Sequence, residues 1–341
     1  MKILIDIGHP GHVHFFKNFI WEMQKKGHKF LITAKDKEMT YILLNKYRLD
    51  FVPLGKHTKS SFKKLLNIPV NNLKLFFIAR KFKPDLFMGL ASFRAAQVSW
   101  LLGKKSIIFD DTEHSKFEIM LYKPFVSFVL TPSVFMKDLG KKQIRYQGYH
   151  ELAYMHPNWF KPNPNVLKEL NIKNDERYFL LRFVSWEATH DRGYQGLSLE
   201  TKRKIINKLV KKGTVLISSE KKLEPEFEKY RFSLSPEKMH DVLNYATLYI
   251  GEGATTASEC CILGTPAIYT NPLNMGYIEE EEKKYGLLFH SLDESFILNK
   301  IDELLKYHNL RDNWSKKRAK LLKDKIDVTS YIIEFVKNLK L

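Results

Sequence analysis

Apolar runs of strand length alternate with helical patterns along most of the chain. The first is KILIDI (2–7), after which Val13, Phe16 and Phe19 recur at the spacing of an amphipathic helix. Further strand-length runs follow at 29–33, 51–54, 85–89, 106–109 and 127–131. Because helices separate these strands, they cannot pair as simple hairpins. The order therefore predicts a parallel sheet covered by helices on both faces.

A stretch rich in proline and asparagine, 148–172, interrupts the pattern and is typical of a connector. A second alternation then begins at YFLLRFV (178–184), and the last fifty residues are helical in pattern. A length of 341 residues suits two cores of ordinary size. We therefore predict an α/β protein with two Rossmann-like, doubly wound domains that face each other across a ligand cleft. The expected bounds are 1–150 for the first domain, 151–175 for the linker and 176–341 for the second domain with its helical tail.

The segment GEGATTASE (251–259) carries the most specific pattern. A strand ends at its first glycine, the chain turns through Gly253, and a helix begins near Thr255. The first-turn N–H groups and the hydroxyls of Thr255 and Thr256 would form an anion site suited to a diphosphate. Glu259 lies one turn further on, where a carboxylate can accept hydrogen bonds from two ribose hydroxyls. Each residue also has an ordinary structural reading, since threonines cap helices and glycines turn chains, but their order predicts a nucleotide site.

A cluster of acids follows a strand of the first domain in FDDTEHSKFE (109–118). The carboxyl ends of parallel strands face the ligand in such folds, so Asp110, Asp111, Glu113 and His114 are placed for acid–base chemistry. The alternative is ordinary capping of the following helix.

Three histidines stand in DIGHPGHVHFF (6–16) and raise the question of a metal. Zinc usually takes three or four such ligands, but His12 and His14, two positions apart at a helix start, would point to different faces. We therefore expect no metal and no other cofactor. Gly8 and Gly11 would let the backbone approach a ligand.

Two polar residues of the connector, His150 and Glu151, have two open readings. They either reach the cleft or pack within the hinge.

The segment GEGATTASECCILGTPAIYTNP (251–272) resembles the donor-nucleotide motif of the GT-B superfamily. The similarity is closest to the branch that holds the peptidoglycan N-acetylglucosaminyltransferase MurG and the UDP-N-acetylglucosamine 2-epimerases. GHPGHVHFF (8–16) is similar to the glycine-rich first loop of the MurG-type enzymes. The whole chain also resembles a prokaryotic family of unknown function within this superfamily. The resemblance implies a GT-B fold and a nucleotide-sugar donor, most simply a UDP-sugar.

Carried over to this chain, the resemblance implies that Glu259 holds the ribose and that Thr256 with the 253–256 backbone holds the diphosphate. It also implies that His12 faces the cleft from the first loop as a candidate base or phosphate-contacting residue. The loop at 182–198 is polar where MurG-type enzymes are glycine-rich, so phosphate contacts would pass to side chains. The expected donor-site residues are Arg182, Ser185, Gly253, Ala254, Thr255, Thr256 and Glu259. The expected catalytic residues are His12, Asp111, Glu113 and His114, and Gly8, Gly11, His190 and Asp191 are expected to line the cleft.

These residues predict a glycosyltransferase that moves a sugar to an acceptor hydroxyl, on a lipid-linked or cell-surface polysaccharide precursor. One alternative is a nucleotide-sugar 2-epimerase or hydrolase, which needs no acceptor. Another is a non-catalytic protein that binds a nucleotide sugar or a polyanion. The sugar stays open, because LNMGYIEEEEKKYG (273–286) replaces the paired glutamines with which MurG reads it.

The formal net charge of +18 calls for an anionic partner or a solvated surface. Lysines and phenylalanines interleave over 56–84, which fits an anionic membrane surface or a lipid-phosphate acceptor, or else a solvated helix face. Nucleic acid is an unlikely partner, because no helix-turn-helix, zinc-finger or RNA-binding aromatic pattern occurs.

No apolar run approaches the roughly 20 residues of a membrane-spanning helix, and the N-terminal residues lack a signal-peptide pattern. The cysteines, Cys260 and Cys261, are adjacent and suit a reducing compartment. A cytoplasmic protein, peripheral on the inner membrane face, is therefore expected. The oligomeric state is left open.

Overall fold

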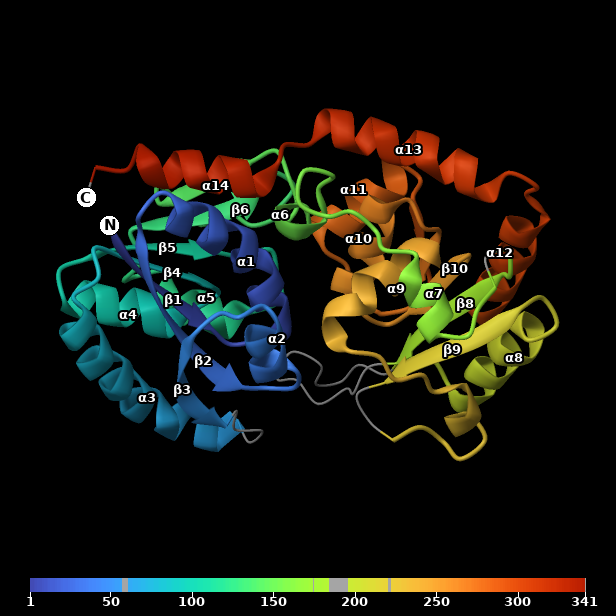
Figure 1. The fold of residues 1–341 in the computed structure, drawn as a ribbon, viewed down its shortest axis with the longest axis horizontal. Coiled ribbons are helices and arrows are strands. Elements are labelled where there is room, and N and C mark those ends of the chain that lie inside the picture. Colours follow the sequence, from blue (N-terminus) through green and yellow to red (C-terminus); the bar gives the residue numbers. More distant parts are fainter. Residues whose placement is uncertain (57–60, 174, 184–195, 220–221, 341) are drawn as a thin grey trace. The chain divides into compact units, whose positions relative to one another are not determined.

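The computed structural model describes residues 1–56, 61–173, 175–183, 196–219 and 222–340. The chain forms two compact units (Figure 1). Unit 1 comprises Met1–Tyr154 and Ile326–Leu341, and unit 2 comprises Met155–Lys325.

Unit 1 is built on a seven-stranded sheet with the order β3-β2-β1-β4-β5-β6-β7, and every pair in it is parallel. The chain order reverses between β1 and β4, which makes this position the switch point where ligands bind in doubly wound folds. The strands are β1 (Lys2–Ile7), β2 (Lys29–Asp36), β3 (Phe51–Lys56), β4 (Leu86–Leu90), β5 (Lys105–Phe109), β6 (Phe128–Pro132) and β7 (Gln143–Tyr146).

Two groups of helices cover this sheet, as the sequence predicts (Figure 1). The first group is α1 (Pro10–Lys25), α2 (Thr40–Lys46) and α14 (Val328–Lys337), and the second is α3 (Ser61–Phe82), α4 (Phe93–Leu101) and α5 (Lys116–Tyr122). A short helix, α6 (Leu152–Met155), follows the last strand. Every residue from Ile3 to Ile7 is buried, because β1 is covered on both faces. Leu75 of α3, Phe87 of β4 and Ile108 of β5 belong to the core between the sheet and the second group.

Unit 2 has a five-stranded parallel sheet with the order β12-β11-β10-β8-β9, in which the chain order reverses between β8 and β10. Its strands are β8 (Tyr178–Phe183), β9 (Thr214–Ser219), β10 (Leu248–Gly251), β11 (Ala267–Tyr269) and β12 (Leu288–His290). Its α-helices are α7 (Asn165–Glu169), α8 (Leu199–Leu209), α9 (Met239–Tyr245), α10 (Ala254–Leu263), α11 (Gly276–Lys283), α12 (Glu294–Lys306) and α13 (Leu310–Asp324), and 228–230 and 236–238 form 3₁₀ turns. Gly264, with φ of 79°, supplies the left-handed residue that ends α10.

The division of the chain differs from the expected bounds at the C-terminus. The sequence places the whole helical tail in the second domain, but α14 belongs to unit 1. Ile326 N–H donates to the Gln147 carbonyl at 2.8 Å, and Thr329 Oγ1 donates to the Ala153 carbonyl at 2.7 Å. The buried stripe of Val328, Ile332 and Val336 therefore completes the core of unit 1.

Candidate functional site

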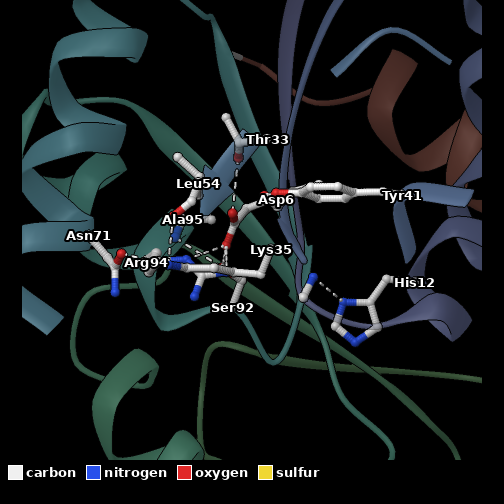
Figure 2. Close-up of polar contacts among 12 residues, drawn as sticks. Asp6, His12, Thr33, Lys35, Tyr41, Leu54, Asn71, Ser92, Arg94 and Ala95 are labelled. Atoms are coloured by element: carbon white, nitrogen blue, oxygen red, sulfur yellow. Dashed lines mark hydrogen bonds and ion pairs between the residues drawn. The ribbon is translucent and has the colours of Figure 1, made fainter. Parts of the chain in front are cut away.

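Asp6 is the centre of a buried polar network at the carboxyl end of β1 (Figure 2). Its Oδ1 accepts a hydrogen bond from Thr33 Oγ1 at 2.9 Å. Its Oδ2 accepts from Ser92 Oγ at 2.5 Å and from Arg94 Nε at 3.0 Å. These contacts compensate a charge with no exposed surface and fix the Arg94 guanidinium beside the loop that follows β1.

Lys35 adds a second buried cation at the end of β2 (Figure 2). Its Nζ donates to the Leu54 carbonyl at 2.8 Å and to Asn71 Oδ1 at 2.6 Å. Desolvation, with the nearby Arg94 charge, lowers the pKa of Lys35 to about 8. Sequence analysis missed this network, although an aspartate inside a buried apolar strand is a signal that could have found it.

His12 lies in the first turn of α1, where the sequence expects a candidate base. Gly8 N–H donates to its Nδ1 at 3.3 Å. Desolvation of the ring, together with the neighbouring His9 and Lys37, holds the pKa of His12 well below its usual value. Gly11 N–H donates to His9 Nδ1 at 3.1 Å, so His9 caps α1. The glycine–histidine loop is therefore ordered by backbone donors.

Asp111, just after β5, forms an ion pair with a histidine of the connector. Its Oδ2 lies 2.9 Å from His150 Nδ1, and its Oδ1 accepts from Thr112 Oγ1 at 3.0 Å. His150 is 4% exposed and packs edge-on against the Phe15 ring at 4.9 Å. Burial would raise the pKa of Asp111, but the charge and hydrogen bond of His150 outweigh it, and the net shift is downward. Asp111 is thus an oriented carboxylate, and His150 lies inside unit 1 beside a predicted catalytic residue.

The other acids of this segment accept hydrogen bonds from nearby groups of unit 1. Asp110 accepts from Tyr122 OH at 2.6 Å and from Thr112 N–H at 3.0 Å, and desolvation raises its pKa to about 7. Glu113 is buried and accepts from Met136 N–H at 3.1 Å. His114 is partly exposed in the turn before α5. Asp111 is the predicted catalytic acid for which the structure shows an ion pair with a histidine.

In unit 2, the predicted donor residues meet where β8 and β10 end. Gly253 is the N-cap of α10 and brings no side-chain cap to its first turn. A Cβ on Gly253 would lie 3.5 Å from Thr256 Oγ1 and 3.7 Å from Arg182 Nε. Ala254 and Thr255 are the first two helical residues, and Thr255 is exposed. A helix N-terminus, a hydroxyl and a guanidinium thus surround one glycine, an arrangement suited to an anion.

Glu259 lies on α10 and is paired with a residue that the sequence did not indicate. Its Oε1 is 3.0 Å from Nε2 of His240 on α9, and their exposed fractions are 6% and 3%. No signal in the sequence links two residues on different helices. The pair fixes the direction of the Glu259 carboxylate.

The turn after β10 is tied to the loop after β11. Asn271 Nδ2 donates to the Glu252 carbonyl at 2.8 Å, and Asn271 Oδ1 accepts from Leu273 N–H at 2.8 Å. The buried Glu252 carboxylate accepts from Leu197 N–H at 3.1 Å. These residues, which sequence analysis also missed, hold the loops that border the α10 N-terminus.

Three predicted residues, Ser185, His190 and Asp191, lie outside the described residues. Among the residues that are described, no group of three or more histidine, cysteine or acidic side chains could hold a metal ion. The expectation of metal-independent chemistry stays a prediction. Within the same described ranges, no helix is both long and apolar enough to span a bilayer.

The fold is similar to that of solved structures that include a UDP complex, a UDP-GlcNAc 2-epimerase and a rhamnosyltransferase. MnaA of S. aureus in complex with UDP matches with a TM-score of 0.70 and 11% identity, over 99% of this chain and 97% of that one. The UDP-GlcNAc 2-epimerase of Neisseria meningitidis bound to UDP-GlcNAc matches with a TM-score of 0.70 and 15% identity, over 99% and 100%. The spinosyn rhamnosyltransferase SpnG with spinosyn aglycone matches with a TM-score of 0.66 and 12% identity, over 99% and 100%. These likenesses confirm the predicted GT-B fold class.

A curated relative extends the similarity to sequence. The uncharacterized protein MJ0665 of Methanocaldococcus jannaschii is 23% identical over 318 residues, which are 89% of this chain and 92% of that protein. The model of the family described as "Protein of unknown function (DUF354)" matches residues 1–340, and the chain belongs to this family.

Proposed function

We propose that this protein is a glycosyltransferase that moves a sugar from a UDP-linked donor to an acceptor hydroxyl. The observation that carries the proposal is the set of Arg182, Gly253 and Thr256 around the N-terminus of α10. Two solved structures of the same fold contain UDP or UDP-GlcNAc, which supports a uridine nucleotide as the ligand of this site. The acceptor class that suits the basic chain is a lipid-linked or cell-surface polysaccharide precursor.

The proposed chemistry divides between the two units. In unit 2, the first-turn N–H groups of α10 and the Arg182 guanidinium stabilise the negative charge of the departing diphosphate. Glu259, held by His240, accepts hydrogen bonds from the ribose hydroxyls. In unit 1, the Asp111 carboxylate takes the proton of the acceptor hydroxyl as that oxygen attacks the sugar.

A 2-epimerase is the second candidate, and the Asp111–His150 pair is the observation that favours it. A carboxylate oriented by a buried histidine can also take a proton from carbon, a step that needs no acceptor. Incubation of the purified protein with UDP-N-acetylglucosamine alone separates the two. A transferase leaves the compound intact, whereas release of UDP or formation of UDP-N-acetylmannosamine favours the epimerase. Tight binding without turnover under any condition favours a non-catalytic protein.

Replacing Gly253 by alanine is expected to weaken UDP binding by about tenfold or more, as measured by calorimetry. The added Cβ makes only ordinary contacts within the protein, at 3.5 Å and beyond, so the fold tolerates it. The same methyl group occupies the space from which a phosphate oxygen reaches the helix N-terminus, and loss of one charge-assisted hydrogen bond costs about 1.5–3 kcal/mol.

The matched control is Gly264→Ala at the other end of α10. Because Gly264 has φ of 79°, an alanine there strains the backbone and lowers the free energy of unfolding by about 1 kcal/mol. UDP affinity should nevertheless stay at the wild-type value. Unchanged affinity in Gly253→Ala would remove the donor-site assignment.

We also propose that unit 1 binds the inner, anionic face of the cytoplasmic membrane and that the protein is otherwise cytoplasmic. The described part of α3 exposes Val70, Leu73 and Phe77, each more than half accessible, on one face. The neighbouring helix α4 exposes Trp100 at 59%. Arg80 adds a positive charge to α3, the helix that carries the three exposed apolar residues. Exposed apolar groups with cations beside them suit an anionic lipid surface.

Vesicle sedimentation tests this proposal. The protein is expected to bind vesicles that contain phosphatidylglycerol, to bind pure phosphatidylcholine weakly, and to release as salt rises, because salt screens exposed charges. Phe77→Ser should reduce binding, whereas Ile42→Ser, which removes another exposed apolar residue from α2, should not. Equal binding of both variants and both lipids would exclude the α3 surface.

A further inference from the structure

The hydrogen bond between Gly8 and His12 fixes which imidazole nitrogen can carry a proton. The Gly8 N–H can only donate, so His12 Nδ1, 3.3 Å away, accepts (Figure 2). A neutral imidazole has one donor and one acceptor nitrogen, and its proton therefore lies on Nε2. In this state Nε2–H of His12 can donate a hydrogen bond to a ligand, while the Nδ1 lone pair already accepts from the Gly8 N–H.

The charges that face His12 oppose a second proton on the ring. His12 lies in the first turn of α1, at the positive end of the helix dipole, with His9 and Lys37 nearby. The acids near it, Asp6 and Asp111, act in the opposite direction. Both acids already have cationic or histidine partners of their own, and burial adds to the preference for the uncharged ring.

Arg94 places a cation near the same glycine. A Cβ on Gly8 would lie 3.8 Å from His12 Cε1 and 3.9 Å from Arg94 Nη2, so the ring and the guanidinium both lie near the open position beside Gly8. An N–H donor and a guanidinium near one glycine suit an oxygen that is negatively charged and carries no proton, such as a phosphate oxygen.

We propose that His12 is a neutral hydrogen-bond donor that contacts a substrate phosphate oxygen through Nε2–H and does not accept the proton of the reaction. The identity of the substrate rests on the proposed function. The tautomer of His12 is assigned independently of it. Proton acceptance then falls to Asp111, whose carboxylate is oriented by His150 and Thr112.

Nitrogen-15 NMR of the full-length labelled protein tests the proposal without any turnover. Long-range proton–nitrogen spectra distinguish the tautomers of each imidazole, and the His12 signals are identified by their loss in His12→Gln. We expect the neutral Nε2–H form, with no titration near the usual histidine value. A ring that carries its proton on Nδ1, or that gains a second proton near the usual histidine value, would overturn the proposal.

Two ligands then distinguish the source of the phosphate. A shift of the His12 Nε2 signal on addition of UDP assigns the contact to the diphosphate of the donor. A shift with octyl phosphate, and none with UDP, assigns it to a phosphate on the acceptor. The absence of a shift with both ligands refutes the phosphate contact.

Kinetics provide the third measurement, using two variants. Glutamine carries an amide N–H close to the position of Nε2, so His12→Gln is expected to keep turnover within about tenfold of wild type, while His12→Ala loses about 10²-fold. The acidic limb of the pH–rate profile should be the same in wild type and His12→Gln. Equal losses in both variants, with that limb abolished, would identify His12 as the base. If the protein shows no turnover at all, the proposed function fails. The NMR spectra still test the tautomer and protonation state of His12, because they do not depend on turnover.

Discussion

Replacing Asp111 by asparagine is expected to lower sugar transfer by about 10²–10⁴-fold, because a positioned general base contributes about that much. Asparagine keeps the shape of the side chain and leaves a neutral amide beside His150 Nδ1, which lies 2.9 Å from Asp111 Oδ2 in the wild type. It cannot take a proton from a hydroxyl. UDP affinity should stay at the wild-type value, since Asp111 is not one of the proposed donor-site residues. Initial rates and calorimetry with UDP measure the two effects separately.

The adjacent carboxylate supplies the control. Asp110 directly follows β5, one residue before Asp111, but its oxygens accept from Tyr122 OH and from Thr112 N–H. In Asp110→Asn, the side-chain NH2 replaces one of the two accepting oxygens and faces a hydrogen-bond donor. The free energy of unfolding should therefore fall by about 1–3 kcal/mol. Transfer by the folded variant should remain close to wild type. If Asp110→Asn loses as much activity as Asp111→Asn while it stays folded, the base is misassigned.

The fold was largely predictable because its signals are local. The strand at Lys2–Ile7 reads as apolar from neighbouring residues alone, and the helix that follows shows its period within a few turns. The edge strand β7 was missed, because QIRY is four residues long and exposes Arg145. The return of α14 to unit 1 depends on Gln147 and Ala153, which lie far from it in sequence, so no local pattern could predict it.

For the candidate site, the sequence predicted the local backbone geometry but not the long-range partners, and the roles of its residues stay predictions. The turn from Gly251 through Gly253 to Thr256 is contiguous, and the structure places it at a helix N-terminus as expected. The histidines that pair with the predicted catalytic and ribose-binding acids, His150 and His240, come from other parts of the chain. A sequence shows that an acid stands at a strand end, but only packing determines which histidine faces it.

Replacing Glu259 by alanine is expected to weaken UDP binding by about 10–10²-fold, since hydrogen bonds to a charged group contribute about 1.5–3 kcal/mol each. The carboxylate is buried, and His240 at 3.0 Å fixes its direction. Glu281→Gln is the matched control in the same unit. Desolvation raises the pKa of Glu281 to about 8, so it is mostly uncharged at pH 7, and glutamine should leave UDP affinity unchanged.

Deoxygenated nucleotides show whether the effect of Glu259 acts through the ribose. Wild type should bind UDP more tightly than 2′-deoxy-UDP, because the missing hydroxyl leaves a buried carboxylate oxygen without its donor. In Glu259→Ala the two nucleotides should bind equally, since the partner of that hydroxyl is gone. If the preference for UDP persists in the variant, another residue reads the ribose, and the weaker binding of Glu259→Ala reflects the loss of the pair with His240 instead. The melting temperature of Glu259→Ala separates these two causes. Loss of the pair leaves a buried histidine without its acceptor, which destabilises unit 2 whether or not nucleotide is bound. A melting temperature close to wild type would therefore assign the weaker binding to the lost ribose contact.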